Sequence, residues 1–170
     1  MKSHRLFGMI QPKQEMKFKP SVYKVGCLGK VVNFEETNDN RFIINLSGII
    51  RFNIKKEYES NKLYREFEVD YSDFKEDLVV RKINKEKYDL TNLLKKIKFY
   101  FRKKNYLAEL EELNKLNVDQ LISAICMISP FSIEEKQKLI ETIDLHEKLN
   151  VLEEILSFNL LDNNNNNTIQ

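Results

Sequence analysis

The side chains that could act as nucleophiles, bases or metal ligands are few and lie far apart in the chain. Ser123, Ser129 and Ser132 fall in or beside a stretch with helical spacing, and positions in or at the caps of helices account for them. A catalytic serine also needs an adjacent activating base. His4 and His146 are the only histidines, and two isolated histidines do not make a metal site. We therefore expect no catalytic residue, no metal and no cofactor.

The cysteines and the clustered carboxylates also argue against a catalytic or metal site. Cys27 and Cys126 lie in separate apolar runs without a Cys-x-x-Cys spacing, which argues against a zinc or redox site. Buried free thiols suit a reducing compartment. Glu66, Glu68 and Asp70 alternate along one strand face, whereas acid–base catalysis needs carboxylates in contrasting environments. A solvated strand face explains these three carboxylates.

Composition limits the classes of partner. The 170 residues are 42% apolar and 32% charged, with a net charge of +2. Binding to duplex DNA requires a clustered basic excess, which this balance does not indicate. No apolar run approaches the roughly 18 residues that span a bilayer, and the first residues do not resemble a signal peptide. We expect a cytoplasmic protein that binds neither DNA nor membranes.

One basic cluster has an alternative interpretation. Lys95, Lys98 and Arg102 surround the aromatic run at 99–101, and interleaved cations and aromatic rings occur in proteins that bind RNA. Helical spacing instead places Leu94 and Ile97 inward and the cations outward. The first interpretation is an amphipathic helix with a charged outer face, and an RNA-binding patch remains the alternative.

The first half of the chain has the sequence pattern of β-strands. Residues 1–77 contain all four glycines and three apolar runs of strand character, in which Val25, Cys27, Val31 and Phe34 are candidate core positions. Residues 37–40 have the composition of a hairpin turn. A glycine within such a run indicates a bulge or a close approach of two backbones. We predict a strongly bent antiparallel sheet.

The second half must fold as helices. Residues 78–161 contain no glycine and show helical periodicity from about residue 85. Asn117 and Asp144 are candidate N-caps, Ser132 with Glu135 forms a capping box, and residues 107–116 predict a short helix. The tail, 162–170, contains five consecutive asparagines and is predicted to be disordered. Strands followed by a block of helices define an α+β fold.

Four short motifs, in this order, resemble those of the N-terminal domain of Lon-type ATP-dependent proteases. They are Leu6-x-Gly8-Met9-Ile10, Val25-Gly26-Cys27-Leu28-Gly29, Leu46-x-Gly48-x-x-Arg51-Phe52 and Glu135-Lys136-Gln137-x-Leu139-Ile140-Glu141. The resemblance implies a PUA-like antiparallel pseudo-barrel followed by a helical bundle. Its structural motif positions here are Gly8, Gly26, Gly29, Gly48, Arg51, Phe52 and Gln137.

The resemblance also implies a function. It suggests a non-catalytic module that recognises unfolded or damaged polypeptides, with a protease as a further partner and an adaptor role in protein quality control. The chain lacks the G-x-x-x-x-G-K-[ST] loop that ATP use requires. Met9, Met16 and Phe18 are the candidate polypeptide contacts, with a core or loop-anchoring role as their alternative. Arg51 is expected to fix strand ends by binding carbonyls or a carboxylate.

The beginning of the chain departs from the family pattern. Family members usually begin roughly 40 residues earlier, and loss of two strands would leave unpaired edges and an incomplete barrel. Our hypothesis is that this sequence is truncated at its N-terminus. Besides polypeptide recognition, a PUA-like RNA-binding protein and an assembly module remain alternatives.

Overall fold

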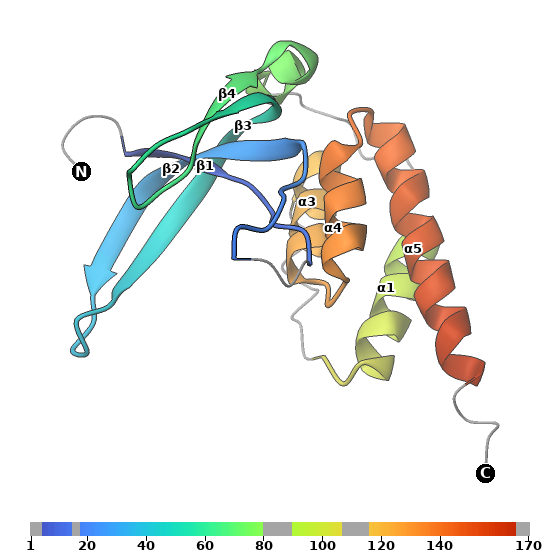
Figure 1. Ribbon diagram of the computed structural model, residues 1–170. Coiled ribbons are helices and arrows are strands. Elements are labelled where there is room, and N and C mark those ends of the chain that lie inside the picture. The colour runs from blue at the N-terminus through green and yellow to red at the C-terminus, as the bar shows by residue number, and fades with distance from the viewer. Residues whose placement is uncertain (1–4, 15–17, 80–89, 107–115, 166–170) are drawn as a thin grey trace. The chain divides into compact units, whose positions relative to one another are not determined.

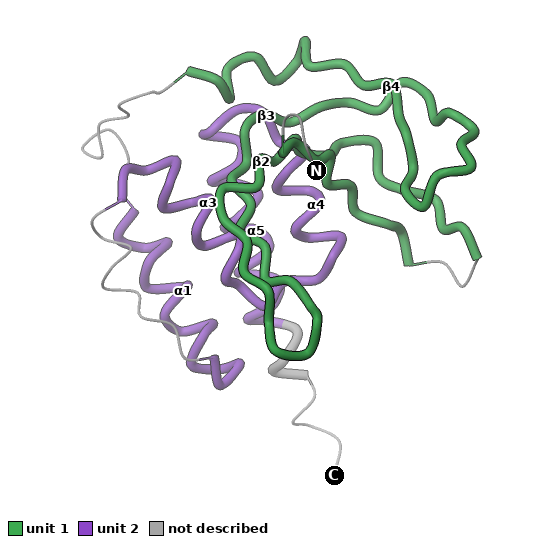
Figure 2. Tube along the Cα trace, turned by 90° about the vertical axis from the view of Figure 1, so that its left-hand side faces the viewer, with its two compact units in different colours: residues 1–80 green, residues 81–170 purple. Residues whose placement is uncertain are grey.

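The computed structural model describes residues 5–14, 18–79, 90–106 and 116–165, with side chains up to residue 161. The chain divides into two compact units, Met1–Val80 and Arg81–Gln170 (Figure 2). The first unit contains the strands and the second contains the longer helices (Figure 1). The predicted α+β class is confirmed.

Unit 1 is a four-stranded antiparallel sheet in the order β1-β2-β3-β4. The strands are β1 Leu6–Met9, β2 Val25–Glu36, β3 Phe42–Tyr58 and β4 Glu66–Asp70. Each strand pairs with the next one along the chain. The predicted antiparallel sheet is therefore confirmed, and in the described residues it does not close into a barrel.

The β2–β3 hairpin is longer than its neighbours (Figure 1). β1 pairs with β2 only up to Lys30, and β4 pairs with β3 only from Asn53 onward. Residues 32–46 therefore form a ribbon of two strands, closed by the predicted turn. In that turn Asn40 has a φ of 59°, a left-handed conformation that asparagine tolerates well, and its N–H donates to the Thr37 carbonyl.

Phe52 is one of the most buried side chains of unit 1, with 2% of its surface exposed. Gly26 lies directly opposite Phe52 in the β2–β3 pair. A methyl group added to Gly26 would lie 2.7 Å from both Phe52 Cζ and the Met9 carbonyl oxygen. Tyr71 packs edge-on against the ring at 6.1 Å between centroids. Gly26 is therefore the glycine at which a close approach excludes a side chain.

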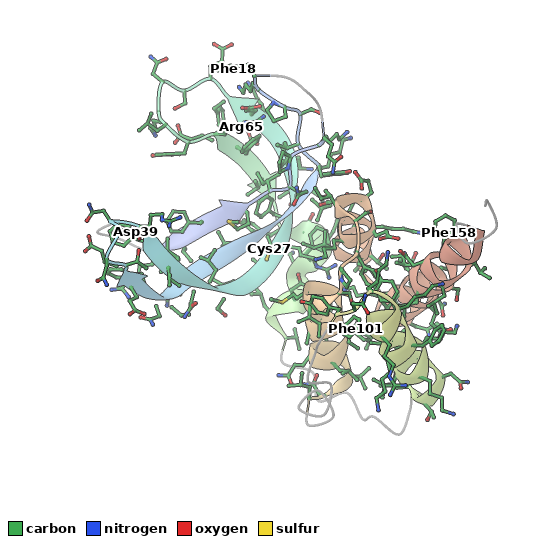
Figure 3. The ribbon with its side chains drawn as sticks, turned by 90° about the horizontal axis from the view of Figure 1, so that it is seen from below. Phe18, Cys27, Asp39, Arg65, Phe101 and Phe158 are labelled. Atoms are coloured by element: carbon green, nitrogen blue, oxygen red, sulfur yellow. The ribbon has the colours of Figure 1, made fainter. Side chains whose placement is uncertain are left out.

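Unit 2 contains α1 Thr91–Lys103, α3 Val118–Ile128, α4 Ile133–Glu141 and α5 Leu145–Asn165. The predicted caps are confirmed. Asn117 and Ser132 form capping boxes with Gln120 and Glu135, and Asp144 accepts from the N–H of Glu147. The core includes Leu93, Ile97, Phe101, Leu121, Ile122, Ile125, Leu139, Leu152 and Leu156; Figure 3 shows Phe101 among these helices.

β3 continues through Gly48 to Tyr58, and a bulge lies beside Gly48, as a glycine within an apolar run predicts. Other boundaries differ from the predictions. The 3₁₀-helix η1 Ser72–Leu78 begins before Asp77, anchored by buried Phe74. The backbone of α5 is helical through Asn165, within the predicted disordered tail, and residues 166–170 lie outside the described residues. The helix predicted over 107–116 falls almost wholly outside them too.

Candidate functional site

Unit 1 exposes a row of large apolar side chains on one face of its sheet, which we call the apolar strip. Phe42, for example, is 56% exposed and Met9 is 55% exposed. Isolated exposed apolar residues are ordinary, but a contiguous exposed group marks an interaction surface. The members of the apolar strip are Phe7, Met9, Phe34, Phe42, Ile44 and Leu46.

The strand register places these six side chains on the same face. Phe34 lies opposite Ile44, and residues directly opposite in an antiparallel pair share a face. β3 is regular over residues 42–48, so its even-numbered residues point to one side. Gly48 lies opposite Gly29, which in turn lies opposite Phe7. The strip therefore crosses β1, β2 and β3.

Two distances agree with this register. The rings of Phe34 and Phe42 lie 6.5 Å apart between centroids. A methyl group on Gly29 would lie 3.8 Å from Leu46 Cδ2. Gly29 and Gly48 face each other within the strip and contribute no side chains, so another backbone can approach the sheet there.

The outer edge of β1 borders the apolar strip. The N–H of Val31 donates to the Arg5 carbonyl at 2.8 Å. Because bonded pairs alternate in an antiparallel ladder, the N–H and C=O groups of Leu6 and Gly8 point away from β2. Among the described residues no strand pairs with this edge. It can therefore accept the backbone of an extended segment.

Phe34 corrects the predicted core of the sheet. The uneven alternation of β2 suggested an inward position, but Phe34 is 51% exposed. Val31 lies opposite Leu46 and Phe34 lies opposite Ile44, so the register shift between Val31 and Asn33, which inserts an extra residue into β2, places Val31 and Phe34 on the same face. Val31 is buried as predicted. Phe34 lies farther along the hairpin, where neither β1 nor β4 pairs with it, and there it belongs to the apolar strip.

Arg51 joins the sheet to η1. Its backbone N–H and its Nε–H donate to Asp77 Oδ2 at 3.0 and 2.9 Å, and Nη2 donates to Oδ1 at 2.7 Å. The guanidinium lies over the ring of Phe74, 4.6 Å from its centroid. The Arg51 side chain is only 11% exposed. This geometry assigns Arg51 a contact within unit 1.

Phe18 lies in a loop away from the apolar strip and is fully exposed. Arg65 anchors that loop, because its Nη1 donates to the Pro20 carbonyl at 3.0 Å, and Figure 3 shows Phe18 and Arg65 on the same side of unit 1. Leu63, close to Arg65 in the sequence, is also fully exposed. The exposure of Phe18 argues against a core role.

The ion pairs of Glu57 beside this loop predict a measurable dependence on pH. Glu57 accepts two hydrogen bonds from Arg65, at 2.8 and 2.7 Å, and pairs with Lys19 at 2.8 Å. Hydrogen bonds from Arg65 and then Lys19 lower the pKa of Glu57 to about 2. A depressed carboxyl pKa contributes stability above the unfolded pKa, and this is lost as the pH falls through about 2.

We therefore expect a carboxyl carbon NMR titration to show Glu57 ionised until about pH 2. An Arg65→Gln variant should raise the pKa of Glu57 toward its ordinary value. The pKa of Asp70 is also about 2, but mainly because of Lys55 and Ser72, so it should not move. An unchanged Glu57 midpoint in the variant would contradict the contact.

Reactive chemistry is not evident in the described residues. Burial raises the pKa of the Cys126 thiol to about 11, so that thiol is protonated at neutral pH. None of the described histidines, cysteines and carboxylates form a group of three able to hold a metal ion. None of the described helices has both the length and the apolar character needed to cross a membrane.

The remaining predicted site residues fall in different places. Gly8 lies beneath the Phe52 ring, where an added methyl group would meet Cζ at 3.4 Å. Gln137 is buried in α4 and donates to Glu141 at 2.8 Å. Met16 lies outside the described residues. Of the three predicted polypeptide contacts, only Met9 belongs to the apolar strip.

Sequence reasoning did not bring the members of the apolar strip together. Phe7, Phe42, Ile44 and Leu46 were apolar strand residues without an assigned face. The signal was the apolar run on both sides of the hairpin turn, but the face depends on the bulges at Leu28/Gly29 and Val31/Asn33. Bulge positions of this kind cannot be read from residue types.

Comparisons with known proteins agree on one domain type. A family model described as the ATP-dependent protease La (LON) substrate-binding domain matches residues 1–157. No curated protein matches the chain. Among solved structures, the N-terminal domain of a Mycobacterium avium complex Lon protease is similar, with a TM-score of 0.57 and 18% identity over 88% of this chain and 77% of that one.

A Lon N-terminal domain protein from Xanthomonas campestris is also similar in structure. It has a TM-score of 0.56 and 14% identity over 88% of each chain. At such low identity these two structures support the fold alone, whereas the family match covers most of the sequence.

Proposed function

Because this chain belongs to the family of Lon substrate-binding domains, we propose that it recognises polypeptide substrates through the apolar strip of unit 1. The observation that carries the proposal is the exposure of six large apolar side chains on one face of three strands. Burying such side chains against a partner is favourable by roughly 25 cal/mol per Å² of apolar surface. Extended apolar segments, which folded proteins keep buried, are the ligands that fit it.

We propose strand addition at β1 as the binding mode. The outward N–H and C=O groups of Leu6 and Gly8 would pair with the substrate backbone, and this pairing does not depend on substrate sequence. Alternate substrate side chains would then lie beside Phe7 and Met9 on the apolar strip. This combination favours unfolded segments with apolar residues at every second position.

The broader role follows from this ligand class. We propose that the chain acts without catalysis, as an adaptor that holds unfolded or damaged polypeptides or delivers them to a protease. Cys27 and Cys126 are both free thiols, which favours a reducing compartment such as the cytoplasm. Phe18 and Met16 remain predicted additional contacts.

The proposal predicts different effects for two adjacent residues of β3. Ile44→Ser should weaken binding of an unfolded polypeptide about tenfold, or roughly 1.4 kcal/mol, because Ile44 belongs to the apolar strip. Ile43 is 56% exposed and points to the opposite face, so Ile43→Ser is the matched control and should bind normally. Fluorescence anisotropy with a labelled, chemically unfolded polypeptide measures both affinities, and raising the salt concentration should not weaken binding.

Two outcomes would sink the proposal: equal losses in both variants, or no binding by the wild-type chain. The strand-addition mode has its own control, a probe peptide N-methylated at alternate positions. Methylation removes the N–H donors on one edge, so the affinity should fall while the side chains stay the same. Unchanged affinity would leave the apolar strip as the site and rule out strand addition.

A further inference from the structure

Helix α1 has a buried face and a strongly basic surface. Leu93, Ile97, Tyr100 and Phe101 are buried. Residues 91–104 contain six basic and no acidic side chains. Three of the six have partners within unit 2: Lys96 bonds Glu153 at 3.4 Å, Lys103 donates to the Leu160 carbonyl at 2.8 Å, and Lys104 lies over the ring of Tyr100.

The other three cations, Lys95, Lys98 and Arg102, point to solvent. Their spacing of three and four residues places them along one side of the helix. Within the described part of the chain no carboxylate pairs with any of them. Phe99 lies in the same row and is 59% exposed. We call Lys95, Lys98, Phe99 and Arg102 the basic–aromatic row.

We propose that the basic–aromatic row binds single-stranded nucleic acid. From Lys95 to Arg102 the helix rises about 10 Å, so the three cations can contact about two or three phosphates of an extended strand. The exposed ring of Phe99 offers a face on which a base can stack. Cations that track a backbone beside a stacking ring are the features of single-strand binding without sequence preference.

Two other polyanions fit these side chains less well. A membrane surface would require an apolar face to insert, but the apolar face of α1 is buried in the unit 2 core. An acidic polypeptide could pair with the cations but would leave Phe99 exposed. The predicted RNA patch contained the three cations and the aromatic run 99–101. The structure leaves Phe99 exposed, whereas Tyr100 and Phe101 are buried and cannot contribute.

The test is fluorescence anisotropy of the whole chain with a labelled 20-nucleotide oligouridylate across a salt series. Three phosphate contacts predict a slope of log K against log salt of about −2. The Lys95→Gln/Lys98→Gln/Arg102→Gln variant should lose this slope and most of the affinity. Phe99→Ala should weaken binding about five- to a hundredfold with little change of slope.

A matched control removes the same number of charges from unit 1. Lys19→Gln/Lys55→Gln/Lys62→Gln changes three lysines that pair with carboxylates, and oligouridylate binding should remain close to that of the wild type. Far-UV circular dichroism checks that each variant folds. The basic–aromatic row variants should still bind unfolded polypeptide normally, so this inference can fail independently of the proposed function.

Three results would overturn the inference. They are no binding of oligouridylate by the wild-type chain, an equal loss in the unit 1 control, and competition by polyglutamate at the same charge concentration. The last would show a general polyanion surface in which Phe99 has no part. A deoxythymidylate oligonucleotide of the same length should bind similarly, since the row offers phosphate contacts and a stacking face only; this result would correct the sequence-based expectation of no DNA binding.

Discussion

Replacing Gly26 with alanine should destabilise the protein by about 3 kcal/mol, the upper end of the usual cost of overpacking. The added methyl group would lie 2.7 Å from the Met9 carbonyl oxygen and 2.7 Å from Phe52 Cζ. The carbonyl belongs to a paired strand and cannot move without breaking the β1–β2 ladder. Urea unfolding followed by circular dichroism measures the loss as a lower midpoint at an unchanged m-value.

Gly29→Ala is the matched control for this prediction. Gly29 lies in the same strand, and the atom nearest to an added methyl group is 3.6 Å away, an ordinary contact. None of the described glycines has a positive φ, so neither substitution strains the backbone and the comparison isolates steric crowding. Gly29→Ala should be neutral or slightly stabilising, because alanine loses less backbone entropy than glycine on folding.

A second variant keeps the test informative if Gly26→Ala does not fold. Adding Phe52→Leu removes the ring atoms that the methyl group would meet, while the contact with the Met9 carbonyl remains. The double variant should recover part of the lost stability. Equal stability of Gly26→Ala and Gly29→Ala would contradict the close approach described for Gly26.

The contrast among the glycines shows how far the sequence alone could lead. Glycines within apolar runs predicted bulges or close contacts, and the fold has both: a bulge beside Gly48 and a close contact at Gly26. The assignment of each role to its glycine was not predictable, because it depends on the residue across the ladder. Gly26 faces Phe52, whereas Gly29 faces Gly48.

The helical half was more predictable because its signals are local. A cap such as Ser132 with Glu135 is formed by residues three apart, so the sequence contains both partners. The apolar strip joins Phe7 to Phe34 and Phe42 through two pairings and two bulges. No local sequence pattern encodes these two pairings and two bulges, so the apolar strip could not be predicted from the sequence.

Replacing Asp77 with alanine is the second substitution expected to have a large effect, about 2 to 3 kcal/mol. The carboxylate accepts three hydrogen bonds from Arg51. Removing the carboxylate would leave the Arg51 guanidinium without these bonds, although the Arg51 side chain is only 11% exposed. The contact also joins β3 to η1, so amide hydrogen exchange should show faster exchange in residues 72–78.

Lys55–Asp70 is the control ion pair, because it lies in the same unit at 2.9 Å but with side chains 56% and 32% exposed. Lys55→Ala should cost less than about 1 kcal/mol, as exposed pairs do. A similar cost for both substitutions would mean that the Arg51–Asp77 contact is no stronger than a surface pair.

The double variant Arg51→Met/Asp77→Ala separates the two parts of the effect. Methionine keeps an apolar stem over the Phe74 ring, where the guanidinium now lies 4.6 Å from the centroid, and leaves no buried charge unpaired. The double variant should therefore be more stable than Asp77→Ala alone, since much of the destabilisation in the single variant comes from an unpaired charge. If the double variant is instead the less stable, the pair itself holds η1 on the sheet.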